Sequence, residues 1–252
     1  KKVVNNVKSI TLDGAQSGVV HLTGQQLKTQ GVLTLLNKKN QSGADNGISL
    51  SVSDVLAKDV ASINSNANYA KVSQFSVLDS AGHIALKLSD LQASGAELQE
   101  IRLTDSAVPV KMTFAKYTEN ADVRGKMRGT FGLDVSAASA QQAVTLASDL
   151  HVSSVSIVDH SQAIADQLDA LQISLGVKVK AVTSDDNAIL KVNAIQLQTD
   201  KAVIGKLYKG YQLAVFNVDS MSAMSLKSNK KIVTMDIVDS AANVSKNLVM
   251  LD

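Results

Sequence analysis

The sequence contains three copies of one pattern: Phe75-Ser-Val77-Leu-Asp79-Ser-Ala-Gly-His-Ile84, Val155-Ser-Ile157-Val-Asp159-His-Ser-Gln-Ala-Ile164 and Met235-Asp-Ile237-Val-Asp239-Ser-Ala-Ala-Asn-Val244. Their aspartates stand at positions 79, 159 and 239, so each copy follows the previous one after 80 residues. Recurrence at a fixed spacing is the sequence signature of proteins built from stacked repeats. The sequence therefore predicts a single domain, residues 1–252, made of three tandem repeats at 1–92, 93–172 and 173–252.

The 80-residue register extends beyond these segments. Apolar residues of the second and third copies recur in pairs at Val110 and Leu190, Met112 and Val192, Phe131 and Tyr211, Leu133 and Leu213, and Val135 and Val215. The first copy is longer, because Val20 matches Val110 at a distance of 90 whereas Ile48 matches Phe131 at 83. These distances predict one insertion in residues 37–46 and another in residues 62–68, both polar stretches typical of loops.

Apolar spacing predicts strands that alternate with helices. Alternation predicts four strands per repeat, centred on Phe75 and Val77, Ile101 and Leu103, Val110 and Met112, and Phe131, Leu133 and Val135. Helical spacing at i, i+4 and i+7 predicts buried helix faces at Ile84, Leu88 and Leu91, at Ile164, Leu168 and Leu171, and at Val244, Leu248 and Leu251. Further helices are expected at 117–126, 139–148, 197–206 and 221–229. The expected fold is an α/β repeat solenoid: a parallel β-sheet with short helices on one side, wound in right-handed β-solenoid or leucine-rich-repeat-like coils.

The composition suits thin repeated layers. Hydrophobic residues make up 45% of the chain, but aromatic residues only 3%, and tryptophan is absent. The net charge is +2 and the basic residues are dispersed, which argues against nucleic acid as a partner. The basic stretch of Lys116, Arg124, Lys126 and Arg128 is interpreted as a solvated helix face. The absence of cysteine excludes disulfides, thiolate metal sites and cysteine catalysis, and no stretch is apolar over the length of a membrane span.

Aspartates at equivalent strand ends are the candidate metal ligands. Asp79, Asp159 and Asp239 each end a predicted strand, and Asp105 and Asp185 are expected to do the same one coil later. Carboxylates stacked on successive coils suit calcium. The alternative is that each aspartate, or the Ser or His after it, caps a helix by accepting a backbone N–H. Capping is favoured because the glycine-rich nonapeptide of calcium-binding β-rolls is missing; Asp79, Asp159, Asp239 and Asp185 remain the candidates for Ca²⁺, and no other cofactor is expected.

Other residue types give no sign of a catalytic site. The four histidines, His21, His83, His151 and His160, occupy different repeat positions and form no ladder of metal ligands. The sequence lacks a nucleophile elbow, a phosphate-binding glycine loop, a dinucleotide fingerprint and a zinc-protease helix. The chain is therefore not expected to be an enzyme. The enzymatic alternative that remains is a β-helix polysaccharide lyase or hydrolase, which would need charged residues that break the repeat on one surface.

The segment Ile237-Val-Asp239-Ser-Ala-Ala-Asn-Val244-Ser-Lys-Asn-Leu248 resembles a repeat of very large bacterial type I secreted and surface proteins, the β-strand-repeat, adhesin or S-layer-like proteins. The resemblance covers nearly the whole chain. It implies an extracellular or cell-surface location and a non-catalytic structural or adhesive role. Expected partners are neighbouring repeats, further copies of the chain, or a surface glycan or protein.

The two ends of the sequence suggest how such a module would assemble. The chain begins Lys1-Lys-Val-Val-Asn5, with neither an initiating Met nor a signal peptide, so it is expected to be a mature product or an excerpt. Both ends lie beside the same predicted helix. The alternative function is therefore an S-layer or filament subunit whose residues 1–4 meet residues 248–252 of the next copy. A specific ligand is expected first at residues 37–46, where the array stops repeating.

Overall fold

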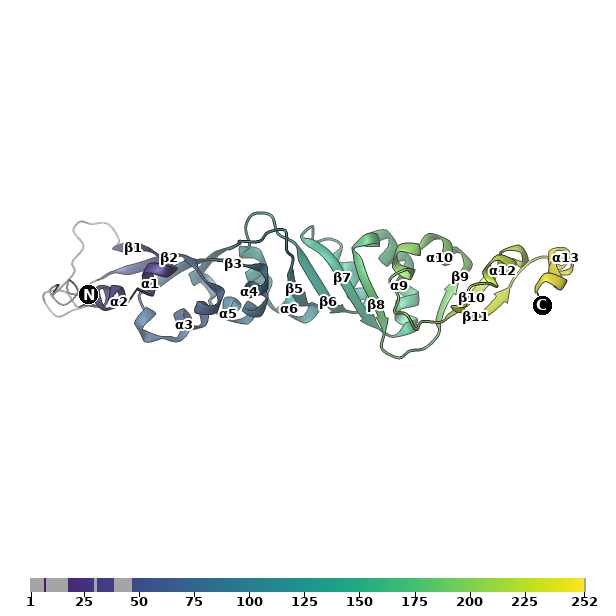
Figure 1. The fold of residues 1–252 in the computed structure, drawn as a ribbon, viewed down its shortest axis with the longest axis horizontal. Helices are drawn as coiled ribbons and strands as arrows, with labels where there is room; N and C mark the ends of the chain where they lie inside the picture. Colours follow the sequence, from purple (N-terminus) through teal and green to yellow (C-terminus); the bar gives the residue numbers. More distant parts are fainter. Residues whose placement is uncertain (1–6, 8–17, 30, 39–46, 252) are drawn as a thin grey trace. The chain divides into compact units, whose positions relative to one another are not determined.

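The computed structural model is an α/β structure in which helices connect the strands of three parallel β-sheets (Figure 1). It describes residues 7, 18–29, 31–38 and 47–251. The chain divides into two compact units: residues 1–111 with 115–132, and residues 112–114 with 133–252. This division falls within the second predicted repeat.

The first unit contains a four-stranded parallel sheet in the order β1-β2-β3-β4, so each strand pairs with the next strand in sequence. Short helices make each connection. The elements are β1 (Val19–Thr23), α1 (Gly24–Leu27), α2 (Val32–Leu36), β2 (Ser49–Val55), η1 (Ala57–Asp59), α3 (Val60–Ser65), η2 (Ala67–Tyr69), β3 (Val72–Asp79), α4 (Ala81–Leu86), α5 (Leu88–Ala93), η3 (Gly95–Glu97), β4 (Leu98–Leu103), most of α6 (Phe114–Glu119), and α7 (Ala121–Lys126). After α7, Met127 forms a parallel bridge with Ile101 of β4.

The second unit contains the sheet β5-β6-β7-β8, whose first strand begins at the boundary between the units, and the sheet β9-β10-β11. Both are parallel and again follow the order of the sequence. The elements are β5 (Val110–Thr113), β6 (Leu133–Ala138), α8 (Ala140–Leu146), β7 (Val152–Asp159), α9 (Ser161–Ser174), η4 (Gly176–Lys178), β8 (Val179–Ser184), β9 (Leu190–Asn193), α10 (Ala194–Thr199), α11 (Lys201–Ile204), β10 (Leu213–Val218), α12 (Ser220–Leu226), β11 (Ile232–Ile237) and α13 (Ala241–Leu251).

The predicted 80-residue register recurs in these elements. Strands β5 and β9 begin at 110 and 190, β6 and β10 at 133 and 213, and β7 and β11 at 152 and 232, while helices α8 and α12 begin at 140 and 220. The expected insertion at residues 62–68 falls on the end of α3 and on η2. The other expected insertion, at 37–46, lies outside the described residues from position 39 onward. The helices expected at 117–126 and 197–206 begin earlier and are each split in two, at Asn120 and Asp200.

Two of the three predicted helix faces are buried. Ile84, Leu88 and Leu91 are at most 3% exposed, and Ile164, Leu168 and Leu171 are fully buried. The prediction for the third copy is wrong, because Leu248 is 60% exposed. Helix α9 packs against α8 on one side and against α10, α11, β8 and β9 on the other, whereas α13 packs chiefly against α12. Apolar spacing therefore predicts which residues share a face of α13, but not how little of that face the described residues cover. 

A β-bulge recurs near the ends of strands β2, β6 and β10. Asp54, Ala137 and Asn217 have positive φ values of 55°, 54° and 55°, and the registers of β2, β6 and β10 with the following strands shift there. Asp and Asn tolerate this left-handed backbone better than Ala does. The second copy therefore adopts the same bulge at a higher conformational cost. No helix of the described residues has the length and apolar character of a membrane span.

Candidate functional site

We call each strand together with the helices that follow it a coil. Asp79 joins two consecutive coils of the first unit. It ends β3 and is 6% exposed. Its Oδ2 accepts the backbone N–H of Ala57, the first residue of η1 in the preceding coil, at 2.9 Å. Its Oδ1 accepts the N–H of Ser80 at 2.8 Å and bonds Nδ1 of His83 at 2.7 Å. Burial acts to raise the pKa of Asp79, but the hydrogen bonds from His83, Ser80 and Ala57 outweigh it and hold that pKa below its ordinary value.

Asp159 and Asp239 make the same two bonds in their own copies. Their Oδ2 atoms accept the N–H of Ala140 at 2.9 Å and of Ser220 at 3.0 Å, the first residues of α8 and α12, 19 positions earlier. Their Oδ1 atoms accept the N–H of the residue that follows each aspartate, at 2.9 and 2.7 Å. The hydroxyl of Ser220 and the amide of Asn243 also donate to Asp239 and hold its pKa well below the usual range.

A second set of carboxylates acts one coil later. Asp105 Oδ1 accepts the N–H of Ala81, the first residue of α4, at 2.7 Å. The equivalent bond to Ser161, the first residue of α9, comes from Asp186, with both of its oxygens at 3.2 Å. The expected equivalence of Asp105 with Asp185 is therefore wrong by one residue. Asp186 also accepts the hydroxyls of Ser184 and Ser161, and these bonds hold its pKa well below the usual range.

The one-residue displacement has a visible origin. Gly95 and Gly176 are equivalent, because each begins a short helical turn with φ of 48°, yet they are 81 positions apart. The helical segment of the second copy is thus one residue longer, and the following loop is one residue shorter. Apolar matches on either side keep the 80-residue register, so the displacement is invisible to them.

These carboxylates orient helix starts. The first amides of a helix have no partner within the helix, and an acceptor supplied from elsewhere satisfies them. At Asp79, Asp159, Asp239 and Asp186 that acceptor belongs to the following coil, so each bond also links two coils. In the part of the chain that the structure describes, no group of three or more His, Asp or Glu side chains is placed to hold a metal ion.

Three of the four histidines lie next to aspartates. Besides the bond between His83 and Asp79, the Nδ1 of His151 lies 3.2 Å from Asp149, and the Nδ1 of His160 bonds Asp185. The carboxylate of Asp185 raises the pKa of the exposed His160. Asp185 is thus a partner of a histidine rather than an acceptor for a helix amide.

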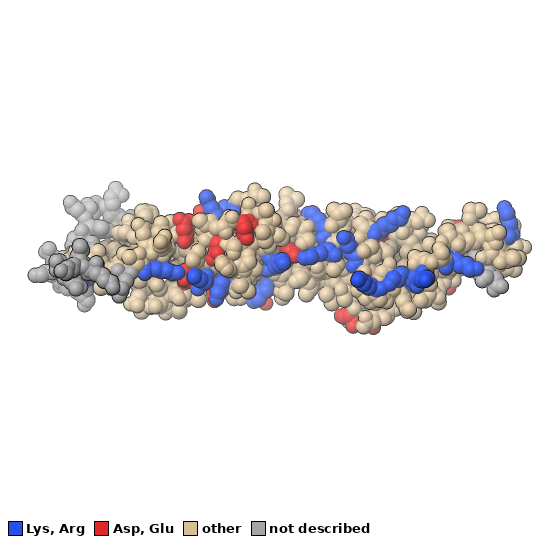
Figure 2. Space-filling model, in the orientation of Figure 1, with Lys and Arg blue, Asp and Glu red and all other residues tan. Residues whose placement is uncertain are grey.

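The basic stretch interacts with its own chain. Arg124 lies over the ring of Tyr117 at 3.6 Å, and Lys116 pairs with Glu119 at 2.8 Å. Lys126 and Arg128 donate to backbone carbonyls. Figure 2 shows Lys and Arg side chains over both units, with Asp and Glu among them in the first unit.

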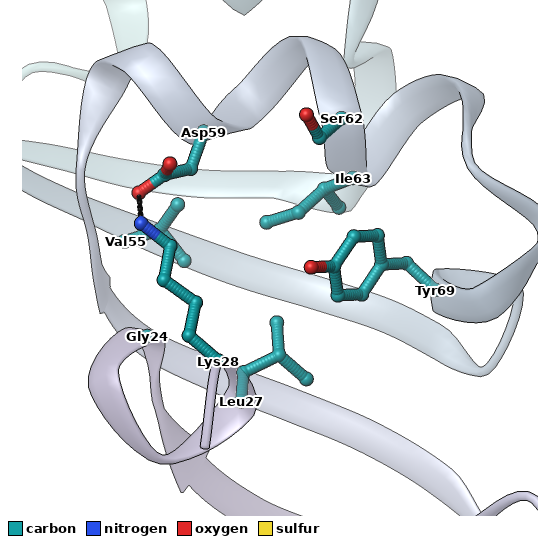
Figure 3. A pocket seen from close by; sticks show the side chains of 8 residues that line it. All are labelled: Gly24, Leu27, Lys28, Val55, Asp59, Ser62, Ile63 and Tyr69. Carbon is teal, nitrogen blue, oxygen red and sulfur yellow. Dashed lines mark hydrogen bonds and ion pairs between the residues drawn. The ribbon is translucent and has the colours of Figure 1, made fainter. Parts of the chain in front are cut away.

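A pocket of about 60 Å³ lies in the first unit, beside the start of α1 (Figure 3). Leu27, Val55 and Ile63 give it an apolar lining, and the hydroxyl of Tyr69 points into it. At its side the ammonium group of Lys28 pairs with the carboxylate of Asp59, 31 residues later in the chain. This pocket combines a cation, an anion and a phenol at one place.

Two wider hollows adjoin the same lysine. One, of about 490 Å³, is lined by Thr23, Gln25, Asp54, Leu56, Lys28 and Asp59. The other, of about 420 Å³, is lined by Leu27, Lys28, Thr29, Gly31, Leu33, Thr34, Asn37, Asn68 and Tyr69. Lys28 borders all three hollows. They lie in the first copy, the one that departs from the repeat, and the last of them includes Asn37, the first residue of the expected insertion.

Sequence reasoning missed both the Lys28–Asp59 pair and a buried acid, Asp200. Lys28 and Asp59 are 31 residues apart and pair in one copy only, so no recurrence in the sequence marks them. The sequence does mark Asp200, because another polar residue, Asn120, stands 80 residues earlier. The structure shows that both are buried, at 2% and 1% exposure. No protein-family model matches the chain, and no curated protein matches it significantly in sequence.

Proposed function

We propose that the chain is a non-catalytic structural or adhesive repeat module, a solenoid that belongs to an extracellular or cell-surface bacterial protein. The observation that carries the proposal is the bond between a carboxylate at or just beyond the end of a strand and the first helix amide of the preceding coil. It occurs at Asp79, Asp159 and Asp239, and one coil later at Asp105 and Asp186. An array that relies on such bonds is stabilised mainly between neighbouring coils.

The sheets support the same proposal. In each sheet the strands are parallel and follow the order of the sequence, which is the pairing that a solenoid requires. The core side chains are mostly Val, Ile, Leu and Ala, which pack in thin layers. The bacterial and extracellular part of the proposal comes from the resemblance at Ile237–Leu248. Its partners would be neighbouring repeats, other copies, or a surface glycan or protein.

Small-angle scattering combined with activity assays tests this function. We expect the purified chain to scatter as a rod with the cross-section of one coil. We expect no cleavage of neutral or uronate-containing polysaccharides, measured by reducing ends and by the absorbance of unsaturated products. A compact particle would contradict the solenoid. Cleavage at an enzyme-like rate that Asp59→Asn or Lys28→Ala abolishes would establish the lyase or hydrolase alternative at the pocket beside α1.

End-to-end assembly into a filament or layer is the second candidate, and the last coil favours it. Met235 is half-buried, and Ile237 and Leu248 are 38% and 60% exposed, although their equivalents in the second copy, at positions 155, 157 and 168, are at most 1% exposed. A further coil from another copy would bury this apolar face. The other half of the expected contact, residues 1–4, lies outside the described residues.

Light scattering across a concentration series tests assembly. We expect the mass to rise with concentration and Leu248→Asp to abolish the rise. The matched control is Leu150→Asp, which changes a leucine that is 90% exposed in the turn before β7 and should leave assembly intact. A chain that is monomeric at all concentrations, or equal effects of the two substitutions, would contradict end-to-end assembly.

A further inference from the structure

Asp200 is a buried acid with an unpaired oxygen. It lies at the junction of α10 and α11 and is 2% exposed. Its Oδ1 accepts the hydroxyl of Thr199 at 2.9 Å, whereas no donor in the described part of the chain reaches its buried Oδ2. An ionised carboxylate in such a place carries a large desolvation cost. The geometry therefore favours the protonated acid, whose O–H can donate.

The acceptor for that proton is the carboxylate of Asp169. Helix α9, which carries the exposed Asp169, packs against both α10 and α11, and the side chain of Asp169 is the hydrogen-bond partner that acts on the pKa of Asp200. Two carboxyls can form such a bond only when one of them is protonated. Burial, and then the bond and the charge of Asp169, raise the pKa of Asp200 to about 6.

Charged side chains on the elements packed around this junction are few. They are Asp166 and Asp169 on α9, Lys178 in η4, Lys180 on β8, Lys191 on β9, Lys201 at the start of α11, and Lys206 just after α11. Lys180 pairs with Asp134 on another strand. Among these groups, Asp169 is the one whose charge acts on Asp200.

The second copy has a neutral counterpart at the same position. Asn120 stands 80 residues before Asp200, is 1% exposed, and donates from Nδ2 to the carbonyl of Lys116 at 2.8 Å. Its Oδ1, like Oδ2 of Asp200, is buried without a partner. Ser89 occupies the position of Asp169, so that copy has no carboxyl pair. This position therefore accommodates an amide, which always carries N–H donors. A carboxylic acid carries a donor only when it is protonated.

We propose that Asp200 and Asp169 share one proton that fastens α9 to the α10–α11 junction, and that this coil loosens when the proton leaves. The inference goes beyond the proposed function and does not depend on it. Because the folded state holds the proton more tightly than the unfolded chain, the stabilisation is greatest in mild acid. It is lost as the pH rises from about 4 to about 6. The pH of the medium would thereby determine how rigid the third repeat is.

Carboxyl ¹³C NMR of the intact chain tests the shared proton without any substitution. We expect the Asp200 carboxyl to titrate near pH 6, well above the ordinary value of 3.8. Titration of Asp200 near pH 4 would overturn the proposal. A shift of the Asp200 resonance on addition of Ca²⁺ at pH 7, together with restored amide protection, would also overturn it, because a cation would then occupy the place assigned to the proton.

Amide hydrogen exchange tests the loosening. The N–H groups of Val203 and Ile204 bond the carbonyl of Asp200, and we expect their protection to fall by up to ~100-fold between pH 4 and pH 7, after correction for intrinsic exchange. Asp200→Asn should remove this pH dependence and retain the fold, as Asn120 does in the second copy. Asp169→Asn should weaken it. Asp166→Asn, on the same helix, is the control and should retain it; a pH dependence that survives in Asp200→Asn would overturn the proposal.

Discussion

The backbone N–H of Ala57 donates to the carboxylate of Asp79 across 22 residues of sequence. The end of one coil's strand thus holds the start of the previous coil's helix. Because Asp79 is 6% exposed and takes three bonds, its loss leaves buried donors without an acceptor. The repeat therefore concentrates stability in a bond that local helix rules would not place there.

Replacing Asp79 by Ala should lower the free energy of unfolding by about 1–3 kcal/mol, because the N–H groups of Ala57 and Ser80 lose their acceptor. Urea unfolding followed by circular dichroism measures the change. Asp90→Ala is the matched control, since Asp90 forms a surface ion pair with Lys87 at 3.1 Å and should cost less than about 1 kcal/mol. Equal losses for the two variants would show that the hydrogen bonds of Asp79 stabilise the fold no more than a surface ion pair does.

Acid should destabilise the chain through the same carboxylates. The pKa values of Asp79, Asp186 and Asp239 are lowered in the folded state, so the unfolded chain binds protons first as the pH falls. Their stabilisation is complete above the ordinary value of 3.8 and is lost as the pH falls through and below it. Thermal melts at pH 5, 4 and 3 should show a falling Tm, with a smaller fall in Asp79→Asn. An unchanged slope in that variant would contradict the assignment.

The repeat and most strands followed from apolar periodicity, because burial imposes the same spacing in every copy. The link from Asp79 to Ala57 did not follow, since capping was expected within a residue's own helix. The exchange of Asp185 for Asp186 was missed because a longer helix and a shorter loop cancel within one period. Asp200 and Asn120 shared a repeat position, but their burial depends on the helix break that the tertiary packing creates.

Replacing Ala137 by Gly should stabilise the second unit by about 0.5–1 kcal/mol. Ala137 has φ of 54°, which is costly for a residue with a Cβ, and glycine relieves that cost at the price of some unfolded-state entropy. The residue is exposed, so packing does not change. Asn217→Ala, at the same position of the third copy, should destabilise by a comparable amount. Thermal unfolding measures both, and shifts of the same sign would contradict the role of the bulge.

Gly24 begins α1 beside the pocket, and a Cβ at this position would lie 2.9 Å from the carbonyl oxygen of Asp54 and 3.0 Å from the Cα of Val55. Both atoms belong to the backbone of the neighbouring strand, so Gly24→Ala should force the helix away from β2 and cost about 1–3 kcal/mol. Ala194 holds the equivalent place in the third copy, so the close approach is a feature of the first copy alone. Gly82→Ala is the control, because a Cβ at Gly82 in α4 meets nothing within 4 Å, and it should be neutral or stabilise by up to about 1 kcal/mol through helix propensity. Urea unfolding of the two variants separates these effects: if Gly24→Ala matches Gly82→Ala, the contact between α1 and β2 is looser than the structure has it, and the pocket around Lys28 is wider.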